Sequence, residues 1–209
     1  MKHRYLVVEG PIGCGKTSLA TKLAQRLGAT TLLEDPTANP FLAQFYRDMR
    51  RYALPTQLFF LFQRAAQLEG LKQPDMFAKP TVSDFTLAKD PLFARLTLDD
   101  AEYQLYRRIY EHMKPQAPVP DLVIYLQASV NTLIGRVKKR GNPIETGLDE
   151  DYMRRLSEAY TRYFYNYADS PLLIVNSERL NFVEVPEHLD LLIQRVDAMR
   201  GGREFFNRA

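Results

Sequence analysis

The fold is decided by a stretch near the N-terminus that reads Gly10-Pro11-Ile12-Gly13-Cys14-Gly15-Lys16-Thr17. It fits the pattern G-x-x-x-x-G-K-[ST], and Ser18 follows it directly. The apolar run Tyr5–Val8, which is typical of a strand, comes before it. After it, Leu19, Leu23 and Leu27 recur at the spacing of one helix face. A strand, this loop and a helix in that order predict a phosphate-binding loop.

The residue types of the loop suit a chain of phosphate groups. Glycines let backbone N–H groups wrap around phosphate oxygens at a distance that a Cβ atom would not permit. The helix that follows adds the positive end of its dipole. We expect Lys16 to reach the β- and γ-phosphates of a nucleotide and the Thr17 hydroxyl to ligate Mg²⁺. Residues 10–18 are therefore the predicted nucleotide site, in which Cys14 is a small filler.

Strand-like runs alternate with longer segments of helical spacing along the rest of the chain. The runs are Tyr5–Val8, Thr30–Leu33, Thr81–Ser83, Leu122–Leu126 and Leu172–Val175. Later helices are predicted to be capped at Asp99, Ser129 and Asp149 and to reach about Met113, Arg140 and Ala168. Strands that alternate with helices require crossover connections. We therefore predict one α/β domain over residues 1–209, with a parallel, five-stranded sheet and helices on both faces.

Composition excludes several classes of protein. The chain has 209 residues, of which 45% are hydrophobic and 25% are charged, so it can build one ordinary core. Lysine and arginine number 28 against 25 acidic residues, and a net charge of +3 is too weak to argue for nucleic acid. One cysteine excludes a disulfide framework. Short apolar runs and an N-terminus unlike a signal peptide argue against a membrane partner, so we expect a cytoplasmic location.

A phosphate-binding loop serves several kinds of phosphoryl transfer. A GTPase would need an N-K-x-D segment, which is absent, and a mechanical ATPase would need more chain, so a compact kinase with a small acceptor remains. Glu34 follows the run Thr30–Leu33, and Asp84 follows Thr81–Ser83. A kinase needs one carboxylate near the acceptor hydroxyl and another near Mg²⁺, which this pair could supply. Taken alone, either acid could instead be a helix cap.

An ordered set of residues resembles the deoxynucleoside kinase family, which includes deoxycytidine, deoxyguanosine and deoxyadenosine kinases. The set is Gly10–Thr17, Glu34, Tyr46, Gln57, Arg64, Asp84, Arg136, Arg140, Gly141 and Glu145. The match spans essentially the whole chain, and Asn39–Leu42 with Phe45 is similar to the bacterial purine branch. The resemblance implies a three-layer P-loop kinase fold, a lid segment at about residues 136–148, ATP as phosphoryl donor, and a homodimer built through helices.

The resemblance implies roles at the reacting atoms. Glu34 would approach the 5′-hydroxyl of a deoxynucleoside and accept or orient its proton. Asp84 matches the first residue of the family's acid-Arg-Ser motif, near Mg²⁺ and the 5′-oxygen, and some descriptions make this acid the proton acceptor. Arg136 and Arg140 match lid arginines that clamp the transferring phosphoryl group. Their i, i+4 spacing places both on one helix face, which could also be a plain solvated basic face.

The resemblance also implies how the acceptor is bound. Tyr46 and Glu145 would hydrogen-bond the sugar 3′-hydroxyl, and Gln57 would read a base edge. Arg64 and Asp90 match positions that contact the base in purine-accepting members, and we expect a purine deoxynucleoside in preference to thymidine. Arg64 lies two helical turns after Gln57, so both can face one pocket. The alternative is an ordinary Arg64–Asp90 structural pair that never touches substrate.

The chain departs from the family pattern at two positions that normally carry positive charge. Phe85, which we count among the substrate-binding residues, occupies the position at which the acid-Arg-Ser motif has its arginine. Residues 141–143 lack a second lid arginine. One explanation is that Lys89, Lys138 or Lys139 compensates for the lost positive charge. The other is that the enzyme turns over more slowly or prefers a different phosphoryl donor.

Two other functions compete with this interpretation. A nucleoside monophosphate kinase would need basic residues to neutralise the substrate phosphate, whereas Glu34 and Asp35 beside the acceptor would repel it. A regulatory module that binds a nucleotide without catalysis is the second alternative, and the missing arginine at Phe85 is its best argument.

Overall fold

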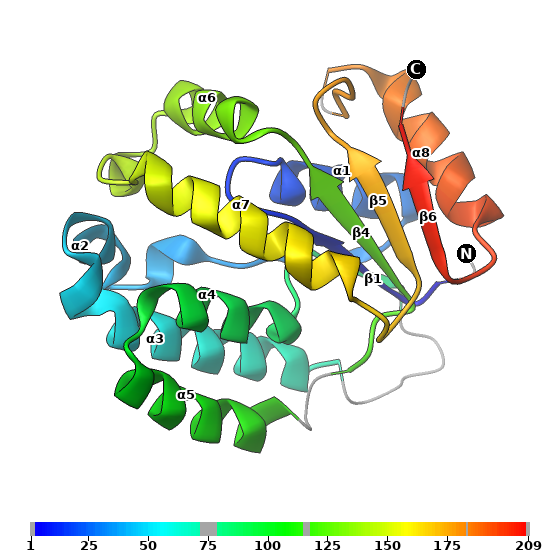
Figure 1. Ribbon diagram of the computed structural model, residues 1–209. Coiled ribbons are helices and arrows are strands. Elements are labelled where there is room, and N and C mark those ends of the chain that lie inside the picture. The colour runs from blue at the N-terminus through cyan, green and yellow to red at the C-terminus, as the bar shows by residue number, and fades with distance from the viewer. Residues whose placement is uncertain (1–2, 72–78, 115–117, 183, 208–209) are drawn as a thin grey trace.

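The computed structural model describes residues 3–71, 79–114, 118–182 and 184–207, and it has the expected α/β architecture (Figure 1). One sheet has the strand order β2-β3-β1-β4-β5-β6, and every pairing in it is parallel. The strands are β1 (Tyr5–Glu9), β2 (Thr30–Leu32), β3 (Thr81–Ser83), β4 (Leu122–Gln127), β5 (Leu172–Asn176) and β6 (Arg203–Phe206). The α-helices are α1 (Lys16–Leu27), α2 (Leu42–Arg47), α3 (Met49–Glu69), α4 (Asp90–Thr97), α5 (Asp100–Met113), α6 (Val130–Arg140), α7 (Glu150–Tyr165) and α8 (Pro186–Ala198).

The sheet has six strands, so the prediction of five was wrong by one edge strand. β6 pairs with β5 from Leu172 opposite Arg203 to Val175 opposite Phe206. Its four residues alternate between exposed and half-buried and include two charged side chains, so they lack the apolar run by which the other strands were predicted. Those five strands lie within a residue of their predicted bounds.

The two faces of the sheet bury different side chains, as the two-residue period of a strand requires. Val7 and Tyr125 point into a core with α3, α4, α5 and α7, while Leu6, Val8 and Ile124 point into a core with α1 and α8. Figure 1 shows these helix groups on opposite sides of the sheet. The three layers leave the carboxyl ends of the strands open to the loops that form the site.

Local hydrogen bonds explain where several helices begin. The capping box before α5 is confirmed: Glu102 N donates to Asp99 Oδ1 over 2.9 Å, and Asp99 N donates to Glu102 Oε2 over 3.2 Å. Ser129 and Asp149 cap α6 and α7 as expected. However, α7 ends at Tyr165 rather than near Ala168, because Asn166 leaves the helical conformation.

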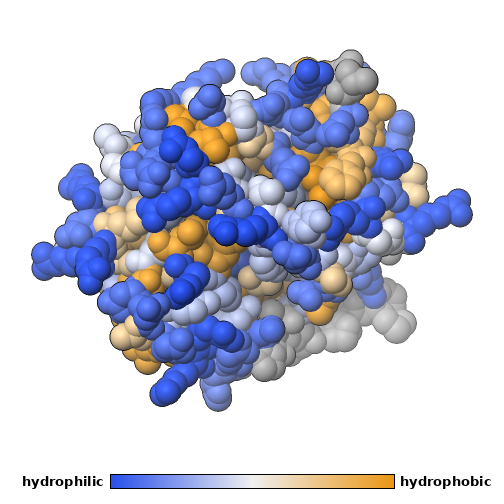
Figure 2. Space-filling view, in the orientation of Figure 1, coloured by the Kyte–Doolittle hydropathy of each residue, from blue (hydrophilic) through white to orange (hydrophobic). Residues whose placement is uncertain are grey.

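The surface is mainly polar, as expected when most apolar side chains lie in the two cores. On the face in Figure 2, hydrophilic side chains dominate and hydrophobic ones form separate patches. Among the helices of the described residues, none is long and apolar enough to span a bilayer.

Candidate active site

The phosphate-binding loop lies between β1 and α1, as predicted. Gly13 has φ 85°, and a Cβ there would lie 2.7 Å from the carbonyl oxygen of Leu133 on α6, so the loop requires glycine at this position. Lys16 folds back over the loop, with its Nζ donating to the Pro11 carbonyl over 3.3 Å. Burial opposes the charged form of Lys16, but nearby groups that favour a cation, among them Glu9, outweigh burial and raise its pKa.

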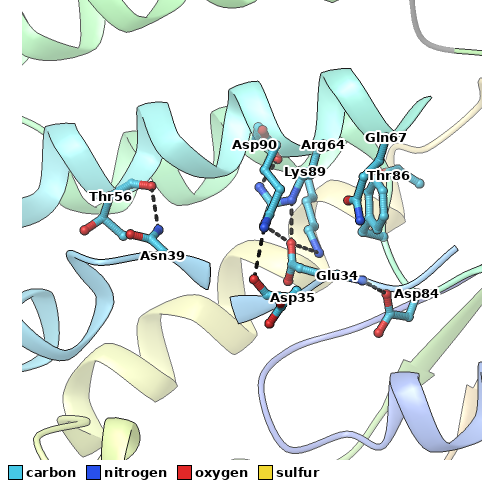
Figure 3. A network of polar contacts seen from close by, with 12 residues as sticks. Glu34, Asp35, Asn39, Thr56, Arg64, Gln67, Asp84, Thr86, Lys89 and Asp90 are labelled. Carbon is cyan, nitrogen blue, oxygen red and sulfur yellow. Dashed lines mark hydrogen bonds and ion pairs between the residues drawn. The ribbon is translucent and has the colours of Figure 1, made fainter. Parts of the chain in front are cut away.

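Thr17, Glu34 and Asp84 meet at the carboxyl ends of β2 and β3. The Thr17 hydroxyl donates to Asp84 Oδ2 over 2.5 Å, and the backbone N–H of Glu34 donates to Asp84 Oδ1 over 2.8 Å. Figure 3 shows the Glu34–Asp84 contact. In the described ranges, no three His, Cys, Asp or Glu side chains cluster to hold a metal ion. A hydroxyl and one carboxylate beside a phosphate loop fit Mg²⁺, which takes most of its ligands from water and substrate phosphates.

The Glu34 carboxylate is surrounded by positive charge. Arg64 on α3 donates from Nε to Glu34 Oε1 over 2.6 Å, and Lys89 Nζ lies 3.7 Å from the same oxygen (Figure 3). Burial favours the neutral acid, but Arg64 and then Lys89 outweigh burial and lower the pKa of Glu34 to about 2. Glu34 is therefore ionised near neutral pH. Such a weakly basic carboxylate can orient the acceptor hydroxyl and take its proton as the transferring phosphoryl group arrives.

Arg64 joins Glu34 to Asp90. Its side chain is 4% exposed, and Nη1 donates to Asp90 Oδ1. Burial raises the pKa of Asp90 to about 6 in spite of Arg64. Asp90 Oδ2 is buried and, among the described residues, has no hydrogen-bond partner. The structure thus brings the predicted base-reading pair together beside Glu34.

A cavity of about 210 Å³ connects the phosphate loop with the acceptor residues. Its lining includes most of the predicted site residues: Ile12, Gly13, Lys16, Thr17, Glu34, Tyr46, Gln57, Arg64, Asp84, Arg140 and Glu145. Gln57 and Arg64 both face it from α3, as their spacing predicted. Asp90 lies behind Arg64, and Phe85 is fully buried in the core of α3, α4 and α7. The structure therefore does not bring Phe85 to the cavity.

The two lid arginines point to different partners. Arg140 makes a two-pronged contact with Glu145, with Nη2 2.6 Å from Oε1 and Nε 3.2 Å from Oε2. Arg136 instead donates to the Ser177 carbonyl over 2.7 Å and to the Cys14 carbonyl over 3.5 Å. Arg136 therefore links α6 to the phosphate loop and to the end of β5, while of these two arginines only Arg140 borders the main cavity.

A second cavity, of about 350 Å³, lies on the other side of the phosphate loop. Its lining combines Cys14, Gly15, Ser18 and Arg136 with residues 177–182. Sequence reasoning missed residues 177–182 because they match no motif. Their position directly after the strand Leu172–Asn176 was the available signal, because loops at the carboxyl ends of parallel strands form ligand sites.

Three side chains of α3 hold the segment that carries Glu34, and two of them were not predicted. Gln67 Nε2 donates to the Leu33 carbonyl over 3.0 Å, and Gln63 Nε2 donates to the Asp35 carbonyl over 3.1 Å. Arg64 lies between them on the carboxylate itself. This arrangement fixes the backbone on both sides of Glu34.

The sequence and the fold of this chain are similar to those of known proteins. Residues 6–199 match the deoxynucleoside kinase family. A deoxyguanosine kinase from Bacillus subtilis is 36% identical over 75% of this chain and 76% of its own length. A deoxyadenosine kinase from Lactobacillus acidophilus is 34% identical over 85% of this chain and 87% of its own. A solved deoxyadenosine kinase from M. mycoides, with the products dCMP and dCDP bound, superposes with a TM-score of 0.81 at 27% identity, covering 93% of this chain and 100% of that one.

The phosphate loop, the paired carboxylates and the cavity between them define a nucleotide-dependent phosphotransferase. Within that class, the chain belongs to the deoxynucleoside kinase family.

Proposed function

We propose that this protein transfers the γ-phosphoryl group of ATP to the 5′-hydroxyl of a deoxynucleoside in nucleotide salvage, with a preference for deoxyguanosine or deoxyadenosine. One observation carries the proposal. A single cavity is bordered by Lys16 and Thr17 at its phosphate end and by Tyr46 and Gln57 at its acceptor end, with Glu34 between them. This order matches the order of donor phosphate, acceptor hydroxyl and acceptor base in such a transfer.

The reaction follows from this placement. Mg²⁺, held by the Thr17 hydroxyl, the Asp84 carboxylate and phosphate oxygens, would neutralise charge on the donor phosphates. Lys16 adds a second positive charge at the β- and γ-phosphates. Glu34 accepts a hydrogen bond from the 5′-hydroxyl, aligns its oxygen with the γ-phosphorus and receives the proton as the new O–P bond forms.

Tyr46 of α2 and the lid residues Arg140 and Glu145 supply sugar selection and charge. Tyr46 and Glu145 border the acceptor end, where they can hydrogen-bond the 3′-hydroxyl. Burial keeps the pKa of the Tyr46 phenol well above its ordinary value, so it remains a hydrogen-bond donor at neutral pH. Glu145 is bonded to Arg140 in this structure. When Glu145 turns to the sugar, Arg140 becomes available to the transferring phosphoryl group.

The cavity beside Arg136 is where we place the base of ATP. It adjoins Cys14, Gly15 and Ser18 of the phosphate loop, so a nucleotide held by the loop can extend into it. Arg136 offers a guanidinium plane there, and guanidinium planes stack on aromatic rings. Arg136 then contributes to donor binding and loop position, and Arg140 to the transferring group.

We also propose a homodimer built through helices. Each of the neighbouring helices α3 and α5 leaves one large apolar side chain half exposed: Phe62 is 52% and Leu105 is 50% accessible. A second copy of the chain would bury such groups. Light scattering at micromolar concentration should give twice the mass of one chain, and a monomer mass would contradict this part of the proposal.

A coupled assay of ADP release tests the function. ATP, Mg²⁺ and the protein are supplied with each of the four natural deoxynucleosides and, separately, with their monophosphates. We expect activity on deoxynucleosides, led by a purine. Activity confined to a monophosphate would identify a nucleoside monophosphate kinase, and no activity on either would favour a regulatory nucleotide-binding module.

A further inference from the structure

Lys89 is a buried lysine at the end of a short 3-10 helix, Leu87–Lys89, that leads into α4. Its side chain is 2% exposed, and its Nζ lies 3.6 Å from Glu9 Oε1 and 3.7 Å from Glu34 Oε1. An ammonium group taken out of water is costly unless acidic partners compensate it. We therefore expect a buried lysine at this position to have a role other than packing.

Compensation of the Glu9 charge does not by itself explain why Lys89 is buried here. Its carboxylate is fully buried but already accepts hydrogen bonds from Gly10 N over 3.1 Å, Thr86 N over 2.7 Å and the Tyr160 hydroxyl over 3.3 Å. A carboxylate with three donors is satisfied without an ammonium group. Glu9 instead forms a fixed anchor at the end of β1 that keeps the Lys89 ammonium beside Glu34.

The other lysines that could restore positive charge lie elsewhere. Lys138 is exposed, and its Nζ bonds Glu150 over 2.7 Å on the outer side of the lid. Lys139 is exposed as well. The ring of Phe85 is buried, with its centroid 6.0 Å from the Lys89 ammonium. Among these three lysines, only Lys89 therefore brings its ammonium close to both Glu9 and Glu34.

We propose that Lys89 is a positioning residue, whose ammonium is anchored by Glu9 and holds the Glu34 carboxylate toward the acceptor 5′-hydroxyl. The same ammonium supplies the positive charge that the family's arginine would carry at the position of Phe85. The proposal rests on the proposed function, because it assigns Lys89 a task in that reaction. Arg64 and Lys89 then hold the same Glu34 oxygen from two elements, α3 and the segment before α4.

The charged environment of Glu34 gives the proposal a measurable consequence. The charged groups around it are Glu9, Lys16, Arg64, Asp84, Lys89 and Asp90. The phenols of Tyr46 and Tyr160 also face it, and burial keeps their pKa values well above neutral pH. Loss of Lys89 removes one of the two cations that contact Glu34 Oε1 and leaves Arg64 alone on that oxygen. A carboxylate held less firmly toward the 5′-hydroxyl should lower kcat more than it raises either KM.

Kinetics with matched variants test this directly. We expect Lys89→Met to lower kcat by about tenfold or more and to change both KM values by less than about threefold. Lys89→Arg should recover most of kcat, because it restores a cation. Lys138→Met, which removes an exposed lysine paired with Glu150, is the control and should match the wild type. A kcat that falls only with the folded fraction would overturn the proposal.

A double variant separates a role toward Glu34 from compensation of Glu9. Glu9→Gln/Lys89→Met removes both members of the Glu9–Lys89 pair and leaves no uncompensated buried charge. The slow turnover should persist, and wild-type turnover would contradict the proposal. Crystal structures of the wild type and of Lys89→Met need no activity. A Glu34 carboxylate turned away from the cavity in Lys89→Met supports the proposal even if no deoxynucleoside is phosphorylated, whereas an unchanged carboxylate position refutes it even in an active kinase.

Discussion

Lys16 lies at the start of α1 and closes over the phosphate loop through its contact with the Pro11 carbonyl. This contact adds little to folding, whereas the charge is needed as negative charge develops on the phosphates. We expect Lys16→Ala to abolish phosphoryl transfer while the melting temperature and the circular dichroism spectrum stay at wild-type values. Wild-type turnover in the variant would show that the nucleotide site has been assigned wrongly.

Glu34 and Asp84 are close enough that their roles must be separated by experiment. Asp84 Oδ1 accepts the Glu34 backbone N–H, and Asp84 Oδ2 accepts the Thr17 hydroxyl, so Asp84 is already committed to the loop. Glu34→Gln should lower kcat by about 10²-fold or more if this carboxylate receives the proton. If Asp84→Asn is far more damaging in single-turnover assays and Glu34→Gln changes little, the two roles should be exchanged.

The pKa of Glu34 predicts how activity depends on pH. Arg64 and Lys89 hold this pKa at about 2, below its ordinary 4.5. Because the folded value is the lower one, ionised Glu34 contributes stability fully above 4.5, and the contribution is lost as the pH falls towards 2. Between about pH 5 and pH 8, protonation of Glu34 should therefore not limit kcat/KM. A wild-type acid limb within that interval that disappears in Glu34→Gln would contradict this.

Among the elements, the lid is held against α2 by a close backbone contact. A Cβ on Gly147 would lie 2.7 Å from the Tyr46 carbonyl oxygen, so the lid can approach α2 only with glycine there. Gly147→Ala should push the lid away from Tyr46 and lower kcat/KM for the deoxynucleoside by about tenfold, with little change in ATP binding. Isothermal titration calorimetry can measure the ATP binding.

Gly135 provides a matched control just before the predicted lid segment. It lies within α6, and a Cβ there would meet no atom within 4 Å. Gly135→Ala should leave activity unchanged and stabilise the protein by up to about 1 kcal/mol, since alanine is the better helix former. Equal losses in the two variants would show that the contact at Tyr46 has no special role.

The elements also show how far sequence reasoning reached. Helix α1 was predicted from the spacing of its apolar residues, and α5 and α6 from the capping box and the serine cap at their starts. The long helix α3 was not delimited, since Pro55 lies inside it and the helix combines buried polar residues with apolar ones. The order of the site residues was predictable from motif spacing. The Arg140–Glu145 contact was not, because the family resemblance gave these two residues other partners. The Glu9–Lys89 contact was not, because it joins residues far apart in the sequence that match no common motif.

At the scale of the whole molecule, we expect base preference to depend on a network that crosses three elements. Arg64 on α3 contacts Asp90 on α4 and Glu34 after β2. If Arg64 and Asp90 read the base, a pyrimidine leaves part of a buried pair unmatched, at a cost of about 1–3 kcal/mol. The expected purine preference over thymidine in kcat/KM is then about ten- to a hundredfold.

Two variants test the network by the ratio of purine to thymidine activity. Arg64→Met removes the base-reading cation and should reduce the preference, but it also removes a partner of Glu34 and lowers kcat for every acceptor. Asp90→Asn leaves the Arg64–Glu34 contact in place and should alter the preference with less effect on kcat. An unchanged ratio in both variants would identify Arg64–Asp90 as a structural pair.

The identity of the phosphorylated product tests the central claim most directly. Deoxyguanosine and deoxyadenosine and, in parallel reactions, their 5′-monophosphates are incubated with ATP labelled on the γ-phosphate, Mg²⁺ and the protein, and the products are resolved by chromatography and ³¹P NMR. We predict label on the 5′-oxygen of a deoxynucleoside 5′-monophosphate, formed in equal amount to ADP, and no label transfer in Lys16→Ala. Label on a deoxynucleoside diphosphate made from added monophosphate, with none on any deoxynucleoside, would contradict it.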